Sequence, residues 1–170
     1  DDVESRGLGD VYKRQGLVEG ICRLPNLRYT TFLQDELVAV VHTGSKLSLP
    51  DEITPEDLSR IPLVLRERGS GTLDVFERAL SEHNMKLSSL NVLLYLGSTE
   101  SIKLFLEHTD CIGIVSIRSI SRELLSGTFR VIEIKGMPML REFCFAQPQG
   151  QESGLSQVLM QFAMHHNKKL

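Results

Sequence analysis

Clusters of basic residues are absent from this sequence, and its overall charge is slightly negative. The formal net charge at pH 7 is −3 and the pI is about 6.0. Proteins that bind nucleic acid through its phosphates carry clustered Lys and Arg side chains. The pair Lys168-Lys169 near the C-terminal end is too short for that purpose. We therefore expect that these 170 residues do not bind DNA by themselves.

Cysteine is scarce, and neither cysteine nor histidine occurs with metal-ligand spacing. The three cysteines, Cys22, Cys111 and Cys144, form no C-x-x-C pair, and the five histidines are spread along the chain. Both facts argue against a metal site, and we expect no cofactor. Cys111 and Cys144 lie in apolar runs, which predicts small buried side chains. Free thiols fit the reducing cytosol, so we expect a cytoplasmic protein.

Long apolar runs are also missing. No stretch is long enough to cross a membrane, and the acidic start Asp1–Ser5 is not followed by the apolar core of a signal peptide. We expect no contact with a membrane. Residues 1–15 show no clear periodicity, and Leu8–Gln15 resembles translated adaptor sequence from assembled reads. We interpret residues 1–15 as a non-native leader, with a native disordered tail as the alternative.

From Gly16 onward, short apolar runs alternate with helical patterns, which predicts an α/β fold with a mixed, mainly parallel sheet covered by helices. A chain of this length holds one domain or two small lobes. The last two strands are expected to form a hairpin-like pair around Gly136–Pro138. We expect strands at 16–20, 36–41, 61–65, 91–96, 111–116, 129–134 and 142–146, a short helix capped by Thr54, and helices at about 72–86, 99–106, 118–125 and 153–166.

A glycine-rich turn, Arg66–Thr72, lies between an apolar strand and an amphipathic helix. The first backbone N–H groups of a helix have no partner inside it, and the peptide dipoles add positive charge at the same end. Glycines let a ligand approach the backbone, and Ser70 and Thr72 add hydroxyl donors. This pattern predicts a site for a small anion. In the alternative reading, Ser70 only caps the helix and the glycines only form the turn.

A second strand–turn–helix junction occurs at Gly97–Glu100, where Ser98 and Thr99 open the next helix. Two such helix N-termini in one lobe could converge on one carboxylate, sulfate or phosphate group. The alternative is that Ser98 is only an N-cap, worth about 1 kcal/mol. The candidate ligand-binding residues at the two junctions are Gly69, Ser70, Gly71, Thr72, Ser98 and Thr99.

Signs of catalysis are missing. The sequence has no G-x-S-x-G elbow, no visible nucleophile–base pair and no phosphate-binding P-loop spacing. Glu67 lies beside Arg66 and Arg68 and is expected to be an ion-pairing carboxylate rather than a general base. We expect neither catalytic residues nor enzymatic activity.

Four motifs occur in a familiar order: Asp35–Val41, Leu65–Thr72, Leu96–Lys103 and Ile112–Ser116. Together they resemble the effector-binding domain of LysR-type transcriptional regulators, over Gly16 to about Phe162. The family patterns are a "DELVLVV" strand, an "REPGSGTR" turn, a "GSNEAIK" helix start and a "GIGILS" strand. Arg68 stands where the family has proline, and Leu73 stands where the family has arginine. We expect Arg68 to supply the positive charge of that missing arginine from another direction.

The resemblance implies a two-lobe periplasmic-binding-protein-like (type II) fold with an effector bound between the lobes. Residues 16–170 would form this domain, with about 36–116 as the second lobe. Residues 16–35 and 129–170 would supply the crossovers and the rest of an incomplete first lobe. The family's winged helix-turn-helix is absent here, so DNA would be contacted only through a missing N-terminal domain.

The resemblance therefore implies a sensor of a small anionic effector, forming a homodimer or homotetramer when complete. Val75 and Leu94 are expected to leave apolar groups on a second surface for the partner subunit, the alternative being burial inside the monomer. Two other functions stay open. One is a stand-alone extracytoplasmic solute-binding protein, and the other is an enzyme of the same two-lobe fold, such as an amino-acid biosynthetic dehydratase.

Overall fold

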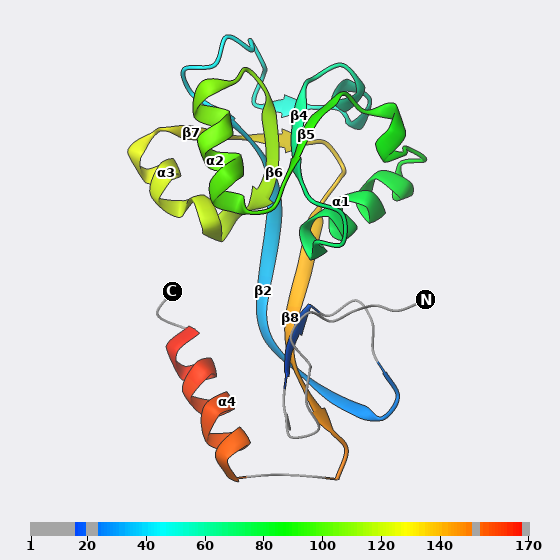
Figure 1. Ribbon diagram of the computed structural model, residues 1–170, viewed down its shortest axis with the longest axis vertical. Coiled ribbons are helices and arrows are strands. Elements are labelled where there is room, and N and C mark those ends of the chain that lie inside the picture. The colour runs from blue at the N-terminus through cyan, green and yellow to red at the C-terminus, as the bar shows by residue number, and fades with distance from the viewer. Residues whose placement is uncertain (1–15, 20–23, 151–153, 168–170) are drawn as a thin grey trace. The chain divides into compact units, whose positions relative to one another are not determined.

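The computed structural model describes residues 16–19, 24–150 and 154–167 (Figure 1). The leader expected at residues 1–15, and Cys22, therefore lie outside the described residues. The described residues divide into two compact units, one of residues 35–140 and one of the described residues before 35 and after 140. Strands β2 (Leu27–His42) and β8 (Met139–Pro148) each contribute residues to both units. Among the described residues, no helix is long and apolar enough to cross a membrane.

The larger unit is built on a mixed sheet. Its strands lie in the order β2, β6 (Ile112–Ser116), β4 (Leu63–Arg66) and β5 (Val92–Leu96). β4 is parallel to both β5 and β6, whereas β2 is antiparallel to β6. Because β4 and β5 are parallel neighbours, the turns that follow them lie at the same edge of the sheet.

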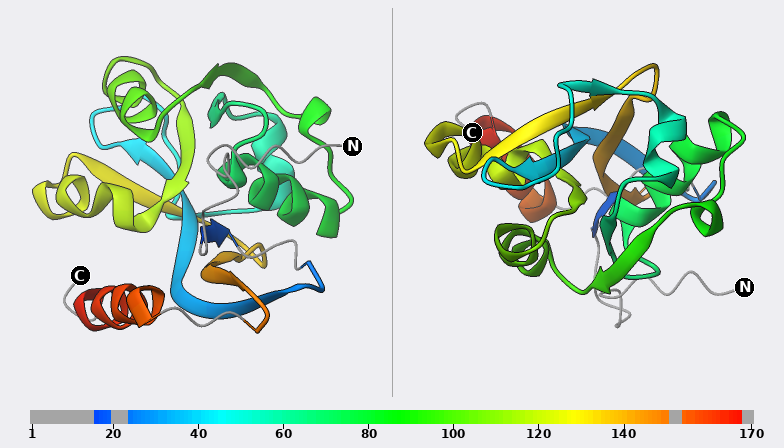
Figure 2. Two further views of the ribbon diagram at one scale, coloured as in Figure 1. Left: turned by 60° about the horizontal axis from the view of Figure 1, so that its bottom comes forward. Right: turned by 90° about the horizontal axis from the view of Figure 1, so that it is seen from above.

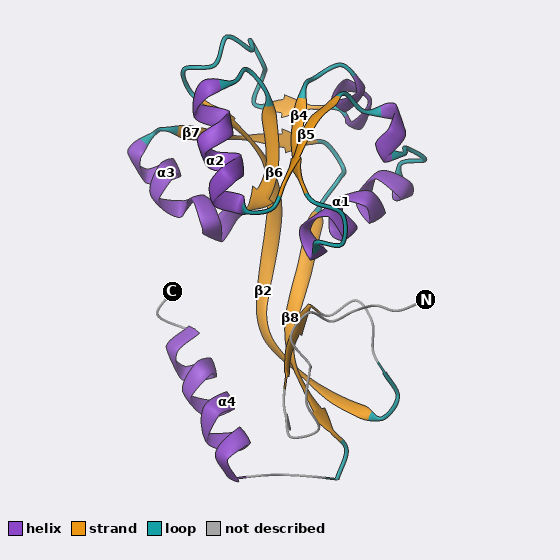
Figure 3. Cartoon of the chain, in the orientation of Figure 1, coloured by secondary structure: helices purple, strands orange, loops and turns teal. Residues whose placement is uncertain are grey.

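Helices cover both faces of this sheet (Figures 2 and 3). Side chains of a strand alternate between the two faces. Accordingly, Leu63 and Leu65 of β4 pack in the core cluster of helix α1, which spans Gly71–Glu82, and Val64 packs in that of helix α2, which spans Thr99–His108. The buried helix residues that fill these clusters include Leu73, Phe76 and Leu80 of α1 and Ile102 and Leu106 of α2.

Gly113 in β6 shows how closely α2 packs on the sheet. A Cβ atom at this position would meet Ile102 Cγ2 at 2.9 Å and Leu106 Cδ1 at 3.1 Å. The absence of a side chain at Gly113 therefore allows α2 to pack at its observed distance from the strand.

The remaining elements of the larger unit are short. Strand β3 (Glu52–Ile53) pairs in parallel with β7 (Phe129–Ile134). The 3-10 helix η1 (Pro55–Ser59) follows Thr54, which forms the predicted cap with Asp57. The other short helices are η2 (Leu87–Ser89), η3 (Ile117–Ile120) and α3 (Ser121–Ser126), the last ending at Gly127 in the left-handed conformation.

The smaller unit contains β1 (Gly16–Glu19), parts of β2 and β8, and helix α4 (Gly154–Asn167). β1 pairs antiparallel with β8, from Gly16 opposite Ala146 to Glu19 opposite Phe143. The Gln147 amide lies 3.0 Å from the Met160 sulfur and so joins α4 to β8. The apolar residues that the sequence places on one face of α4 are largely exposed: Leu155, Val158, Leu159 and Phe162.

Several sequence-based predictions are wrong in detail. β2 begins at Leu27, far before the expected residue 36. Helix α1 ends at Glu82 rather than near residue 86, because the chain turns at Asn84, whose φ is 57°. Val75 was expected to face a second surface, with burial inside the monomer as the alternative, and the structure shows the alternative: Val75 is buried in the core with Leu73 and Phe76.

The expected hairpin around Gly136–Pro138 is also wrong. β7 pairs with β2 and β3, whereas β8 pairs with β1 and lies beside β2. The structure groups residues 129–140 with the larger unit, and the family resemblance implied that residues 129–170 supply the crossovers and the rest of the first lobe. Phe129, Ile132 and Ile134 are buried in the core of the larger unit, which explains the grouping.

Candidate functional site

The first candidate turn joins β4 to α1. The Ser70 amide donates to the Glu67 carbonyl at 3.2 Å and closes a four-residue turn. Gly69 occupies the third position with φ 82°, a conformation that favours glycine. Ser70 is the N-cap of α1, and its Oγ accepts the Leu73 amide at 3.2 Å. The capping role considered for Ser70 is therefore present.

The second candidate turn joins β5 to α2 and has the same design. Ser98 is the N-cap, and its Oγ accepts the Ser101 amide at 3.1 Å. The Ser98 and Ser101 hydroxyl groups also lie 2.8 Å apart. Both serines thus stabilise helix starts, and each cap is worth about 1 kcal/mol.

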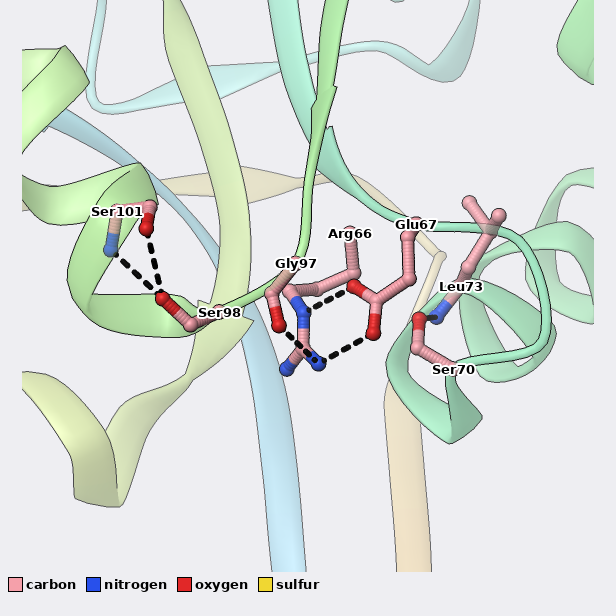
Figure 4. Close-up of polar contacts among 7 residues, drawn as sticks. All are labelled: Arg66, Glu67, Ser70, Leu73, Gly97, Ser98 and Ser101. Carbon is pink, nitrogen blue, oxygen red and sulfur yellow. Dashed lines mark hydrogen bonds and ion pairs between the residues drawn. The ribbon is translucent and has the colours of Figure 1, made fainter. Parts of the chain in front are cut away.

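The two turns lie side by side because Arg66 pairs with Leu96 in the register of the parallel strands. The Glu67 amide donates to the Leu96 carbonyl at 3.1 Å. The Arg66 side chain adds a second link (Figure 4). Its Nε and Nη2 bind the Glu67 carboxylate at 2.8 and 3.0 Å, and Nη2 also reaches the Gly97 carbonyl at 3.3 Å. Arg66 therefore joins the turn before α1 to the turn before α2.

Backbone donors remain available at both helix starts. No acceptor within the described part of the chain lies against the amides of Gly71, Ser98, Thr99 or Glu100, as is usual for the first turn of a helix. The two threonine side chains of the candidate site differ in burial. Thr72 is buried, whereas Thr99 is half-buried. The donors that the structure brings together are therefore mainly backbone amides.

Arg68 lies apart from these donors. Its side chain is exposed and lines a hollow of about 500 Å³ on the side of α1, together with Gly69, Lys86 and Tyr95. The lining of this hollow includes none of Ser70, Thr72, Ser98 and Thr99. Of the two ion-pairing partners expected for Glu67, the structure forms the pair with Arg66.

The cysteine and histidine side chains described next have structural roles. Cys111 and Cys144 are buried free thiols, as predicted. Burial, reinforced by the nearby Asp110 carboxylate, raises the pKa of the Cys111 thiol to about 11, so this sulfur is a poor nucleophile near neutral pH. His83 Nε2 lies 3.0 Å from the Gly136 carbonyl and links the end of α1 to the loop before β8. Within the described ranges, no group of acidic, histidine and cysteine residues could hold a metal ion.

Comparison with known proteins decides the family. The sequence model of the LysR substrate binding domain matches residues 15–168, nearly the whole chain. The chain belongs to the LysR substrate-binding domain family. The family resemblance noted in the four motifs is thereby confirmed.

The LysR domain is similar to several transcriptional regulators. A region of 144 residues, 84% of this chain, is 29% identical to the HTH-type transcriptional activator CmpR of Synechocystis, of which it covers 46%. A region of 119 residues, 70% of this chain, is 33% identical to the uncharacterised HTH-type transcriptional regulator YeiE of Escherichia coli K12, of which it covers 39%. The chain thus spans less than half the length of these relatives. Both are transcriptional regulators.

Solved structures share the fold of this LysR domain. The regulatory domain of CcmR from Synechocystis, in complex with 2-PG, has a TM-score of 0.77 at 23% identity, covering 94% of this chain and 76% of that one. The effector-binding domain of QuiR, in complex with shikimate, has a TM-score of 0.72 at 18% identity, covering 92% and 72%. These likenesses confirm the predicted α/β two-lobe, type II periplasmic-binding-protein-like fold.

Proposed function

We propose that this chain is the effector-sensing domain of a LysR-type transcriptional regulator and that its effector is a small anion. The proposed site lies at the starts of α1 and α2, with Gly69, Ser70, Gly71, Thr72, Ser98 and Thr99 around the anion and Arg68 at its periphery. The observation that carries the proposal is the alignment of two helix N-termini at one sheet edge, with amides at both that have no acceptor in the described chain.

The physical basis is the charge at a helix start. Unpaired N–H groups and aligned peptide dipoles favour an anion there. Glu67 does not cancel this preference fully, because Arg66 neutralises its carboxylate in a two-bond pair. Glu100 is likewise paired, since its carboxylate lies 2.9 Å from Lys103 Nζ. Lys103 is shared with Glu123, and Asp74 adds a carboxylate in the first turn of α1. The backbone amides would therefore attract an anion against part of this negative charge.

The regulatory step follows from linkage. A ligand shifts a conformational equilibrium only if it binds one state more tightly than the other. Binding at one site then changes the affinity of the second site, and the reverse effect has the same size. We propose that effector binding at α1 and α2 changes the DNA affinity of a helix-turn-helix segment of the full-length protein. The regulator would be a homodimer or homotetramer and would act in the cytoplasm without a metal or other cofactor.

Calorimetric titration of the full-length protein tests the site. The probes are 2-PG, shikimate, inorganic phosphate and sulfate, each compared with an uncharged analogue where one exists. Thr99→Val removes a hydroxyl at the start of α2, and we expect about tenfold to a hundredfold weaker binding, the loss of one hydrogen bond to a charged ligand. Thr109→Val at the other end of α2 is the control and should leave binding unchanged.

The result that contradicts the proposal is equally specific. The proposal is wrong if no anion binds the unmodified protein. It is also wrong if Thr99→Val binds the probe as tightly as the control Thr109→Val and the unmodified protein do, because the ligand site then lies elsewhere. Regulation is read separately, as the change that the bound probe makes to the affinity of the full-length protein for its own promoter DNA.

A further inference from the structure

One arginine contacts both turns of the candidate site. Arg66 is the last residue of β4, and its side chain is 21% exposed. Two of its nitrogens hold the Glu67 carboxylate, which belongs to the turn before α1, and Nη2 also reaches the Gly97 carbonyl, in the turn before α2. Figure 4 shows these contacts between the two turns.

The contact to Gly97 has a consequence for the neighbouring amide. In a trans peptide the carbonyl and the following N–H point in opposite directions. When Arg66 holds the Gly97 carbonyl, it also fixes the direction of the Ser98 N–H, which points away from the guanidinium. This amide is one of the donors at the start of α2 that has no acceptor in the described chain.

We infer that Arg66 is the positioning residue of the proposed anion site. It orients the Ser98 N–H through the Gly97 carbonyl and fixes the spacing of the two helix starts through Glu67. The inference rests on the proposed function, because it assigns a role within that site. Arg66 acts here through the backbone, and it need not touch the ligand.

Arginine suits this role better than lysine. The planar guanidinium presents several N–H groups in a rigid fork. Two of them fit the Glu67 carboxylate, which fixes the plane and leaves an N–H of Nη2 directed to Gly97. An ammonium group is a point charge on a flexible stem and cannot hold two turns in one fixed geometry.

A simpler alternative is that Arg66 attracts anions by its charge alone. The two accounts predict opposite signs for Glu67→Gln. Removal of the Glu67 negative charge strengthens anion binding if charge alone matters. It weakens binding if Glu67 anchors Arg66, because the guanidinium loses the charged half of its two-bond pair. The accounts also differ for Arg66→Lys, which keeps the charge but loses the fork.

The chain provides a matched control. Arg130 also links a carboxylate and a backbone carbonyl elsewhere in the same unit, with one bond to the carboxylate: Nη1 lies 3.2 Å from the Asp51 carboxylate, and Nη2 donates to the Leu49 carbonyl at 2.7 Å. Arg130→Gln therefore reports the general effect of losing an arginine that links a carboxylate and a backbone carbonyl. It should change stability without changing the ligand site.

The experiment has two parts, both on the full-length protein. Residual dipolar couplings of the backbone amides are measured first without ligand, because they report N–H directions. We expect the Ser98 coupling to change in Arg66→Gln and Arg66→Lys but not in Arg130→Gln. Titration with 2-PG and shikimate follows. We expect about tenfold weaker binding in Arg66→Gln, Arg66→Lys and Glu67→Gln, and no change in Arg130→Gln.

The outcomes separate the two proposals. An unchanged Ser98 coupling in both Arg66 variants overturns the positioning role whether or not a ligand binds. Tighter binding in Glu67→Gln, or full affinity in Arg66→Lys, overturns it in favour of simple charge attraction. If the Ser98 coupling changes as expected but the unmodified protein binds no anion, Arg66 orients the amide and the proposed function fails.

Discussion

The Ser116 hydroxyl donates to the Asp35 carboxylate, with Oγ and Oδ1 2.8 Å apart. Asp35 is only 5% exposed. It is the first residue of the larger unit within β2, and Ser116 ends the neighbouring strand β6. A buried carboxylate is costly unless donors satisfy it. This hydrogen bond therefore stabilises the place where β2 enters the larger unit.

We predict that Ser116→Ala lowers the free energy of unfolding by about 1–3 kcal/mol, because it removes a donor to the buried Asp35 side chain and the N-cap acceptor of the Arg118 amide. Urea denaturation measures it. Ser59→Ala is the control, because the Ser59 hydroxyl is exposed and donates to a backbone carbonyl at 2.7 Å. It should cost less than about 0.5 kcal/mol. Equal losses in the two variants would show that the Asp35 contact has no special weight.

Gly113 offers a test of the packing of α2. Gly113→Ala places a methyl group 2.9 Å from Ile102 Cγ2 and 3.1 Å from Leu106 Cδ1, so side chains or backbone must shift. We predict a loss of about 1–3 kcal/mol, as for other overpacked cores. Gly97→Ala is the control, since nothing lies within 4 Å of a Cβ there. Thermal unfolding of the two variants should differ clearly, and similar midpoints would mean that α2 packs less closely than described.

Lys103 makes the stability of the larger unit depend on pH. Its ammonium lies 2.7 Å from the Glu123 carboxylate, and this hydrogen bond lowers the pKa of Glu123 below its ordinary value of 4.5. A carboxyl whose pKa is lower in the folded state contributes stability above its unfolded pKa, and the contribution is lost as the pH falls through the folded pKa. Backbone amides of Thr54 and Lys46 likewise lower the pKa values of Asp57 and Asp110.

We therefore predict that the protein loses stability as the pH falls below about 4.5. Glu123→Gln should lower stability at pH 7 and reduce the difference between pH 7 and pH 3, because one of the linked carboxyls is gone. Urea denaturation at the two pH values measures both effects. Glu133→Gln, which removes an exposed carboxylate without an ion pair in the described structure, is the control. A pH dependence that is identical in Glu123→Gln and the unmodified protein contradicts the assignment.

Edge strand β5 is the expected surface for self-association. Leu93 and Leu94 are 47% and 42% exposed, and the strand forms one end of the sheet order. Exposed apolar groups on an edge strand favour contact with another chain. We predict that the full-length protein forms a two-fold dimer and that Leu94→Glu weakens it by tenfold or more, by burying an unpaired charge.

Sedimentation velocity over a range of concentrations measures the dimer. Leu125→Glu is the matched control, because Leu125 is 90% exposed on α3. A dimer that is unaffected by Leu94→Glu uses another surface.

The sequence was most informative where the signals are local. The capping pattern at Thr54–Asp57, the caps at Ser70 and Ser98, and the glycine that ends α3 all depend on a few neighbouring residues, and each appears in the structure. Long-range pairing was predicted less well. The residues of β2 before position 36 alternate in burial without a strong apolar run. They are therefore recognised as a strand only from their place beside β8 in the sheet.

The burial of Val75 and the contact from Arg66 to Gly97 also depend on long-range packing, which the sequence does not show. Val75 lies beside the main apolar stripe of α1, and it is buried because the core around that helix extends further than the stripe suggests. The link from Arg66 to Gly97 depends on the register that places Arg66 opposite Leu96. Residue types identified both helix starts, but the register of β4 and β5 was needed to find the arginine that joins them.

We propose above that one anion binds at the starts of α1 and α2. Backbone amide chemical shifts of the isotopically labelled protein, followed during titration with 2-PG, shikimate, phosphate and sulfate, test it most directly. We predict saturable shifts for an anion, largest at the amides of Gly71, Ser98 and Thr99, and a lower binding affinity in Thr99→Val. Saturable shifts confined to residues away from both turns, or no saturable shift with any of the four probes, would contradict it.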